Sequence, residues 1–120
     1  MKVAISCIGD KLEAAVDPRF GRAQGFLIVD TAAGTVRYMP NDQNLQAVQG
    51  AGIQAAQHVL SAGVEALITG NIGPKAFRVL QEAGVRVYTG ASGSVGEALE
   101  ALQDNQLPET AQATKPGHWM

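Results

Sequence analysis

An almost uninterrupted apolar run near the start of the chain, Val3–Ile8, is the feature that most constrains the fold. Polar and apolar residues do not alternate in this run, so a strand built from it needs an apolar cover on both faces. Gly9 and Asp10 then end the run. We therefore expect a central strand in a sheet that has further layers on both sides.

The next two strands are expected over Phe26–Asp30 and Thr35–Met39. The short connection between them contains Gly34, a residue type that supplies the positive φ of a tight hairpin, so the two strands should be antiparallel neighbours. After them the apolar spacing changes to that of a helix, which Gly63 stops. The positions that recur at helical spacing are Leu45, Val48, Gly52, Ile53, Ala56, Val59 and Leu60.

Two further strands alternate with two further helices in the second half of the chain. The strands are expected over Ala66–Thr69 and Val85–Thr89. Gly73-Pro74 opens one helix, because proline is tolerated at the first helical position. The pattern Ser94–Glu97 is typical of a capping box and starts the other helix.

The resulting order β-β-β-α-β-α-β-α predicts an α/β protein. Strand–helix–strand units pair their strands in parallel through right-handed crossovers, so we expect a mixed five-stranded sheet with helices on both faces. Residues 1–107 are predicted to form a single domain. Residues 108–120 contain two prolines and a glycine, and we interpret them as a C-terminal tail that can be flexible.

The composition excludes several classes of protein. The chain has 120 residues, of which 46% are hydrophobic and 17% charged, so it can form one folded core. Its net charge of -2 does not suit a nucleic-acid surface, and no apolar run approaches the ~20 residues of a membrane span. Cys7 is the only cysteine, which excludes an internal disulfide and a zinc site built on thiolates. The N-terminus has no signal-peptide pattern, so we expect a cytoplasmic protein.

The loop Asp17–Ala23 is long for a compact domain and carries two arginines, a proline and a glycine. It should lie at the sheet edge where the parallel strands have their carboxyl ends, the edge at which open α/β sheets bind ligands. Helix N-termini at that edge present unpaired N–H groups and a partial positive charge. We therefore predict a pocket for a small anionic ligand at the C-terminal edge of the sheet.

Arg19 and Arg22 are expected to pair with the anion, because a guanidinium offers planar and weakly hydrated donors. Lys75 is a further cation of this edge, although the first turn of a helix more often exposes such a residue to solvent. Phe20 is expected to anchor the loop on the core. The candidate ligand-binding residues are Arg19, Phe20, Gly21, Arg22, Asn71, Ile72, Gly73, Gly90, Ala91, Ser92 and Gly93.

Other chemistry is less well supported by the residues. Cys7 is interpreted as a small buried hydrophobe, with a soft-metal contact as the alternative. The segment His118–Met120 is rich in soft ligands but is interpreted as a loose end of the tail. Asp10 and Asp17 could hold magnesium in a phosphoesterase or nuclease, yet turn and capping roles suit them better. A protein–protein adaptor is the remaining alternative.

Two loop motifs, Val16–Ala23 and Ile68–Phe77, carry a resemblance to a known family, and Met1–Ser6 and Val87–Ala91 add to it. The chain resembles the dinitrogenase iron–molybdenum cofactor biosynthesis accessory family, of the NifX-like and NifB-C-terminal type, over about Met1–Leu107. Within this family it is most similar to the small stand-alone, orange-protein-type members, among which a molybdenum–copper–sulfide cluster is carried.

The resemblance implies a ribonuclease H-like α/β fold and a non-enzymatic role as a binding or carrier protein. The implied cargo is an anionic metal–sulfur cluster, either a molybdenum–copper sulfide or a related molybdenum or iron–sulfur cluster. A cofactor-assembly protein or an ATPase is the implied protein partner, with no nucleic acid and no membrane involved.

Many nitrogenase-associated members have histidine where this chain has Arg19, and that histidine can ligate iron. Arg19 instead favours electrostatic holding of a thiomolybdate-type anion. In this arrangement Arg19 and Arg22 would pair with the anion, and the N–H groups of residues 71–73 and 91–93 would donate to its sulfides. Phe20 and Ile72 would shield it from water.

Overall fold

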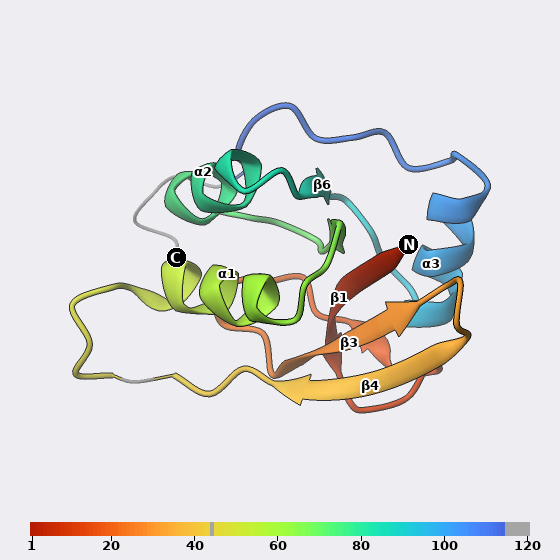
Figure 1. Cartoon of the computed structure of the whole chain (residues 1–120), viewed down its shortest axis with the longest axis horizontal. Coiled ribbons are helices and arrows are strands. Elements are labelled where there is room, and N and C mark those ends of the chain that lie inside the picture. Colours follow the sequence, from red (N-terminus) through yellow and green to blue (C-terminus); the bar gives the residue numbers. More distant parts are fainter. Residues whose placement is uncertain (44, 115–120) are drawn as a thin grey trace.

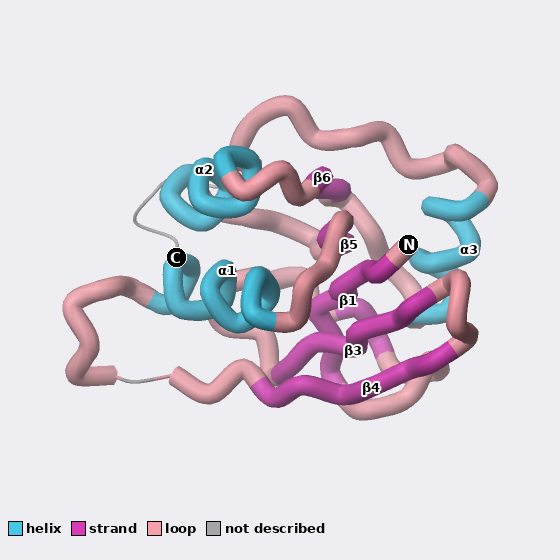
Figure 2. The backbone as a smooth tube through the Cα atoms, in the orientation of Figure 1, coloured by secondary structure: helices cyan, strands magenta, loops and turns pink. Residues whose placement is uncertain are grey.

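The sheet has the central strand that the apolar run predicts. The computed structural model describes residues 1–43 and 45–114, and its strands follow the order β4-β3-β1-β5-β6. Figure 2 shows these five strands beside one another in this order. β1 pairs antiparallel with β3, which pairs antiparallel with β4, whereas β1, β5 and β6 are parallel. The strands are β1 (Lys2–Ile8), β2 (Ala15–Val16), β3 (Gly25–Asp30), β4 (Thr35–Pro40), β5 (Ala66–Ile68) and β6 (Arg86–Tyr88).

Helices cover both faces of this sheet, as predicted. The helices are α1 (Ala51–Ser61), α2 (Pro74–Glu82) and α3 (Val95–Gln103). Ala4 of β1 points into a core closed by α1 and α2, while its neighbours Val3 and Ile5 point into a second core closed by α3. Figure 1 shows α1 and α2 side by side and α3 apart from them. Among the described residues, the longest helix has 11 residues, too few to cross a bilayer.

The local patterns predicted the ends of the five expected strands to within one residue. Pro74 occupies the start of α2, and Ser94 and Glu97 form the complete capping box of α3. Gly34 adopts a φ of 72° in the turn between β3 and β4, the conformation for which glycine was expected there.

Two predictions about the elements were wrong. The first helix begins at Ala51, and Leu45 and Val48 lie before it with exposures of 87% and 101%. Their spacing continues the helical pattern, but Gly50 is the N-cap, so the helix begins only after it. The short strand β2 was not predicted, because two residues carry no periodicity. It pairs with β1 at Cys7 and Ile8, beyond the point where β5 ends.

The segment after α3 crosses the outer edge of β6. Thr110 donates its N–H to Val87 O at 2.7 Å, and its hydroxyl accepts from Thr89 N at 3.0 Å. Thr114 then reaches Ile72, just before α2. This part of the predicted tail is therefore hydrogen-bonded to the domain, whereas His118–Met120 lies outside the described residues.

Candidate anion-binding site

The loop between β2 and β3 is held in shape by one buried carboxylate. Asp17 is fully buried, and its Oδ1 accepts from Arg19 N at 3.0 Å and from Arg19 Nε at 3.4 Å. Its Oδ2 accepts from Gln24 N at 3.2 Å, which ties the two ends of the loop together. Ser6 Oγ donates to Asp17 O at 2.7 Å and fixes the loop to β1. Asp17 is thus committed to the loop, and it is not an open metal ligand.

Phe20 anchors the same loop from beneath. Its side chain is 2% exposed and its ring contacts that of Phe26 at a centroid distance of 5.5 Å. Ile72 is equally buried, at 1%. Both side chains therefore support the rim loops from the core, and neither lies at the surface, where it could shield a ligand by direct contact.

The loop that follows β5 lies directly against this arginine loop. Asn71 N donates to Pro18 O at 2.8 Å, and Phe20 N donates to Asn71 O at 3.2 Å, so Arg19 and Asn71 form a β-bridge. The contact requires glycine at position 70, where a Cβ would lie 2.6 Å from Pro18 Cα. The structure thus brings Arg19 and Asn71 to the same edge of the sheet, as the sequence predicted.

The other half of the arginine loop lies against the start of α1. A Cβ on Gly21 would lie 2.9 Å from Gly52 N, so the two backbones pack closely. Gly21 O accepts from Asn41 Nδ2 at 3.2 Å and from Gln43 Nε2 at 3.3 Å. Arg22 follows in this close-packed segment, and its side chain is exposed.

Asn41 is a positioning residue that the sequence analysis missed. Its Nδ2 also donates to Ala23 O at 2.9 Å, and its Oδ1 lies 2.8 Å from His58 Nδ1 of α1. Through this contact His58 joins α1 to the segment that follows β4. The position of Asn41 directly after a strand, at the ligand edge, was the one available indication.

The N-termini of α1 and α2 both open at this edge. Their N-cap residues are Gly50 and Gly73, which have no side chain that could accept from the first helical N–H groups. Those groups carry the partial positive charge of a helix N-terminus. Arg19 adds a side chain that is 64% exposed despite its contact with Asp17. The edge therefore combines positive side chains with two helix N-termini that no N-cap side chain covers.

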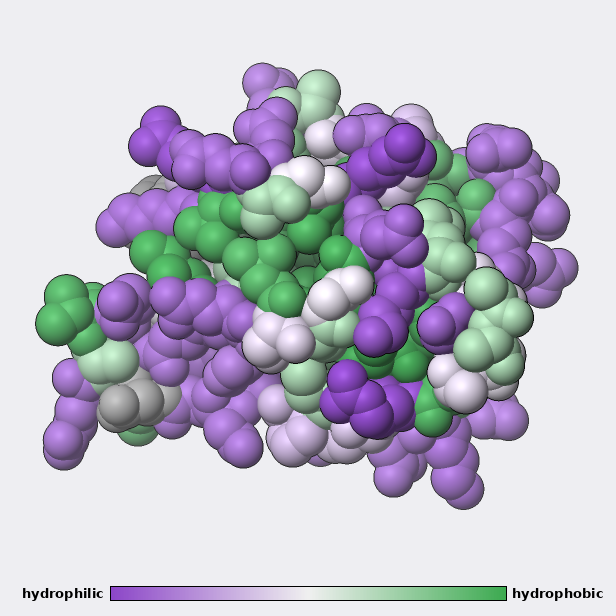
Figure 3. Space-filling model, in the orientation of Figure 1, coloured by the Kyte–Doolittle hydropathy of each residue, from purple (hydrophilic) through white to green (hydrophobic). Residues whose placement is uncertain are grey.

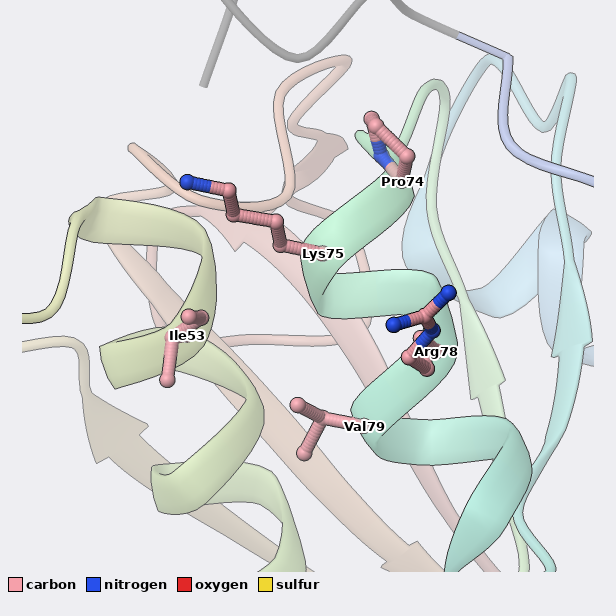
Figure 4. A pocket seen from close by; sticks show the side chains of 5 residues that line it. All are labelled: Ile53, Pro74, Lys75, Arg78 and Val79. Atoms are coloured by element: carbon pink, nitrogen blue, oxygen red, sulfur yellow. The ribbon is translucent and has the colours of Figure 1, made fainter.

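A groove of about 360 Å³ runs between α1 and α2 from this edge. Ile53 and Val79 give it apolar walls, and Lys75 extends from α2 toward α1 across it (Figure 4). Arg78 and Pro74 complete the lining. Figure 3 shows that the surface between the two helices is apolar, with hydrophilic residues around it. Lys75 and Arg78 thus place two cations beside an apolar groove.

Several of the predicted backbone donors are already paired inside the protein. Asn71 N bonds Pro18 O, Gly90 N bonds Gly70 O at 2.9 Å, and Ala91 N lies 3.4 Å from Thr69 O. Ile72 N donates to Thr114 Oγ1 at 2.8 Å. A ligand could use these four N–H groups only by displacing their present acceptors.

The loop after β6 is divided between two neighbourhoods. Its first residues bond the loop after β5, as just described, but Gly93 O accepts from Val16 N of β2 at 2.9 Å. Ser94 forms a bridge with Ala15 and caps α3. Gly93 is therefore fixed beside β2 and α3, while Arg19, Gly21, Arg22, Asn71 and Gly73 gather at the starts of α1 and α2.

The residues proposed for metal chemistry do not form a site. Cys7 is fully buried in the core beneath α3, and burial raises the pKa of its thiol to about 11, so the thiol is protonated at neutral pH. Asp10 is exposed in the turn after β1. Within residues 1–43 and 45–114, no group of three His, Cys, Asp or Glu side chains could hold a metal ion.

Comparison with known proteins supports the resemblance that the loop motifs carry. The family model described as dinitrogenase iron-molybdenum cofactor matches residues 1–105. The apo form of the orange protein from Desulfovibrio gigas is 40% identical, with a TM-score of 0.90 over 95% of this chain and 96% of that chain. A putative NifB protein from Thermotoga is 38% identical, with a TM-score of 0.80 over 95% and 97% of the two chains.

A sequence relative extends the similarity to another organism. An uncharacterized protein of Methanocaldococcus jannaschii is 30% identical over 109 residues, which is 89% of each chain. The family match covers the sheet, the three helices and both loop motifs. The chain therefore belongs to the dinitrogenase iron–molybdenum cofactor family.

Proposed function

We propose that this protein is a non-enzymatic cytoplasmic carrier of an anionic molybdenum–sulfur cluster, specifically a molybdenum–copper sulfide. The observation that carries the proposal is the edge at which the N-termini of α1 and α2 meet four exposed cations and an apolar groove. The cations are Arg19, Arg22, Lys75 and Arg78. Family membership supports a metal-cluster ligand, and similarity to the orange protein supports the molybdenum–copper type.

The chemistry of this edge suits a large sulfide anion better than a phosphate or a bare metal ion. Guanidinium groups are weakly hydrated, so they lose little hydration when they meet a diffuse charge. The walls made by Ile53 and Val79 exclude water from one side of the anion, which strengthens each charge-assisted contact. Each helix N-terminus adds about 0.3–1 kcal/mol for an anion near its first turn.

The structure favours this function over phosphoester hydrolysis. A hydrolase built on Asp10 and Asp17 needs both carboxylates free to bind metal, but both oxygens of Asp17 already accept hydrogen bonds from its own loop. Asp17 could reach a metal ion only if the loop that carries Arg19 opened.

The test is retention of the anion by purified protein. Metal-free protein is mixed with tetrathiomolybdate and a copper salt, passed through a desalting column, and its visible absorbance and metal content are measured. The double variant Arg19→Ala/Arg22→Ala should lose most of the retained colour, because both charges at the arginine loop are gone. The control Arg37→Ala/Arg86→Ala removes the same charge from β4 and β6 and should retain it. Equal retention by both folded double variants would overturn the proposal.

A second candidate function, as a protein–protein adaptor, rests on Leu45 and Val48. These two apolar side chains are 87% and 101% exposed on the segment before α1. Exposed apolar side chains that lie close together are typical of surfaces that contact another protein. A cofactor-assembly protein or an ATPase would be the partner. The variant Leu45→Ser/Val48→Ser should then lose a partner that the wild-type protein captures without the anion, while its anion retention is unchanged.

A further inference from the structure

One backbone donor at the ligand edge is covered by a side chain and not by another loop. Asn71 N, Gly90 N and Ala91 N donate to backbone carbonyls of neighbouring residues in the rim loops, so a ligand that took these donors would separate the loops themselves. Ile72 N differs, because it donates to the hydroxyl of Thr114 at 2.8 Å. A side-chain hydroxyl can rotate away without a change in the backbone. Of these four N–H groups, that of Ile72 is therefore the one that an incoming ligand can take at least cost.

Thr114 belongs to the segment that runs from α3 across the outer edge of β6 to the start of α2 (Figure 1). Two threonines attach this segment to the domain in the same way. Thr110 N donates to Val87 O at 2.7 Å, and its hydroxyl accepts from Thr89 N at 3.0 Å. Thr114 N donates to Ile72 O at 3.0 Å, and its hydroxyl accepts from Ile72 N. The segment is thus attached once beside β6 and once at the start of α2.

The attachment at the start of α2 is the more exposed of the two. Thr110 is half-buried, whereas Ala111, Gln112 and Thr114 are exposed, and Ala113 adds a partly buried contact with the core. Segments with few buried apolar contacts open locally at a low cost in free energy. The Thr114 end can therefore leave α2 while the Thr110 end stays beside β6.

We propose that Thr114 is an internal competitor of the cargo: its hydroxyl occupies the N–H group of Ile72 in the protein without cargo, and the anion displaces it. This inference rests on the proposed function, because it needs an anion at the start of α2, where Ile72 directly precedes the N-cap Gly73. A sulfide that accepts from Ile72 N replaces a neutral acceptor by a charged one, which makes a stronger hydrogen bond. Binding thus releases the Thr114 end, and by the same coupling the Thr114 contact lowers the apparent affinity for the anion.

The test compares Thr114→Val with Thr110→Val in the full-length chain. Each variant replaces a threonine of this segment by a residue of similar shape whose side chain cannot accept a hydrogen bond, but Thr110 bonds the end of β6 and not the start of α2. Metal-free protein is titrated with tetrathiomolybdate and copper(I), and the visible absorbance gives the apparent dissociation constant. Thr114→Val should bind roughly two- to tenfold more tightly than the wild type, the factor that one hydrogen bond supplies. Thr110→Val should bind as the wild type does.

A second measurement follows the release itself. In the nitrogen-15-labelled wild type, loading should change the amide shifts of Ile72 and Thr114 and speed the exchange of the Thr114 N–H with water, while the Thr110 N–H stays protected. Urea unfolding shows that both variants are folded. The inference is overturned if the wild type binds the anion but Thr114→Val binds it no more tightly, if Thr110→Val gains as much, or if loading leaves the Thr114 amide unchanged. A wild type that binds no anion overturns the proposed function, and this inference falls with it.

Discussion

The contact between the two rim loops is tested most sharply by Gly70→Ala. A Cβ at this position would lie 2.6 Å from Pro18 Cα and 2.8 Å from Pro18 O, whereas ordinary contact begins at 3.4 Å. Both atoms belong to the backbone, which cannot rotate away as a side chain can. The φ of Gly70 is not in the left-handed region, so the expected cost comes from this overlap alone.

The size of the effect follows from what must move. Pro18 is held by the bond from Asn71 N at 2.8 Å, and the next bond along the bridge joins Phe20 N to Asn71 O. Separating the loops strains both bonds, each worth about 0.5–1.5 kcal/mol, and overpacking a tight site costs about 1–3 kcal/mol. The lower chain entropy of alanine in the unfolded state offsets about 0.4–1 kcal/mol. We expect the free energy of unfolding to fall by about 2 kcal/mol, in the middle of the overpacking range.

The assay is urea unfolding followed by circular dichroism, with Gly96→Ala as the control. A Cβ at Gly96 of α3 meets Leu12 O at 3.4 Å, an ordinary contact, so alanine there should be neutral or stabilising by up to about 1 kcal/mol. Gly70→Ala should also weaken retention of tetrathiomolybdate and copper, since Arg19 moves with its loop. If Gly70→Ala is as stable as the wild type, the close packing of the two loops does not hold them in place.

Three further changes test the parts that shape the site. Asp17→Ala should lower the free energy of unfolding by about 1–3 kcal/mol, because it leaves the partly buried N–H groups of Arg19 and Gln24 without their acceptor. An unchanged urea midpoint would show that the carboxylate does not organise the loop. Ser94→Ala should lower the free energy of unfolding by about 1 kcal/mol, because the capping box of α3 is lost. The control Ser92→Ala should lower it little, and equal losses in the two variants would contradict the capping role of Ser94. Burial raises the pKa of Cys7 from 9.0 to about 11, so the unfolded chain releases this proton first. The stability that the thiol contributes is complete below pH 9 and is lost as the pH rises toward 11. Between pH 9 and pH 11, the stability of Cys7→Ala measured by thermal unfolding should fall less than that of the wild type. An equal fall in both proteins would show that burial does not raise the pKa of this thiol.

The elements that sequence predicted well are those with local causes. The run Val3–Ile8 is apolar on both faces, and the structure covers both with helices. The starts of α2 and α3 are set by a proline and by a capping box, each of which acts within a few residues. The convergence of the loops follows from strand direction alone, which is why Arg19 could be placed beside the loop after β5.

The parts that sequence missed depend on partners distant in the chain. Asp17 was interpreted as a turn or capping residue. Its carboxylate also bonds the far end of the loop, because the folded chain brings Gln24 N back to it. The N–H group of Ile72 was expected to be free, and it is paired with Thr114, a residue 42 positions away. Leu45 and Val48 keep helical spacing outside any helix, and periodicity does not reveal where the core ends.

The proposed binding site of the anion is the place where the arginine loop meets the starts of α1 and α2. The most direct measurement is a titration of nitrogen-15-labelled protein with tetrathiomolybdate and copper(I), followed by amide chemical shifts. We expect the largest shifts at Arg19, Arg22, Gly52 and Lys75, with little change in β4 or α3. If the largest shifts occur instead at the first turn of α3, or at the amides around Cys7, the anion binds elsewhere and the proposed site is wrong.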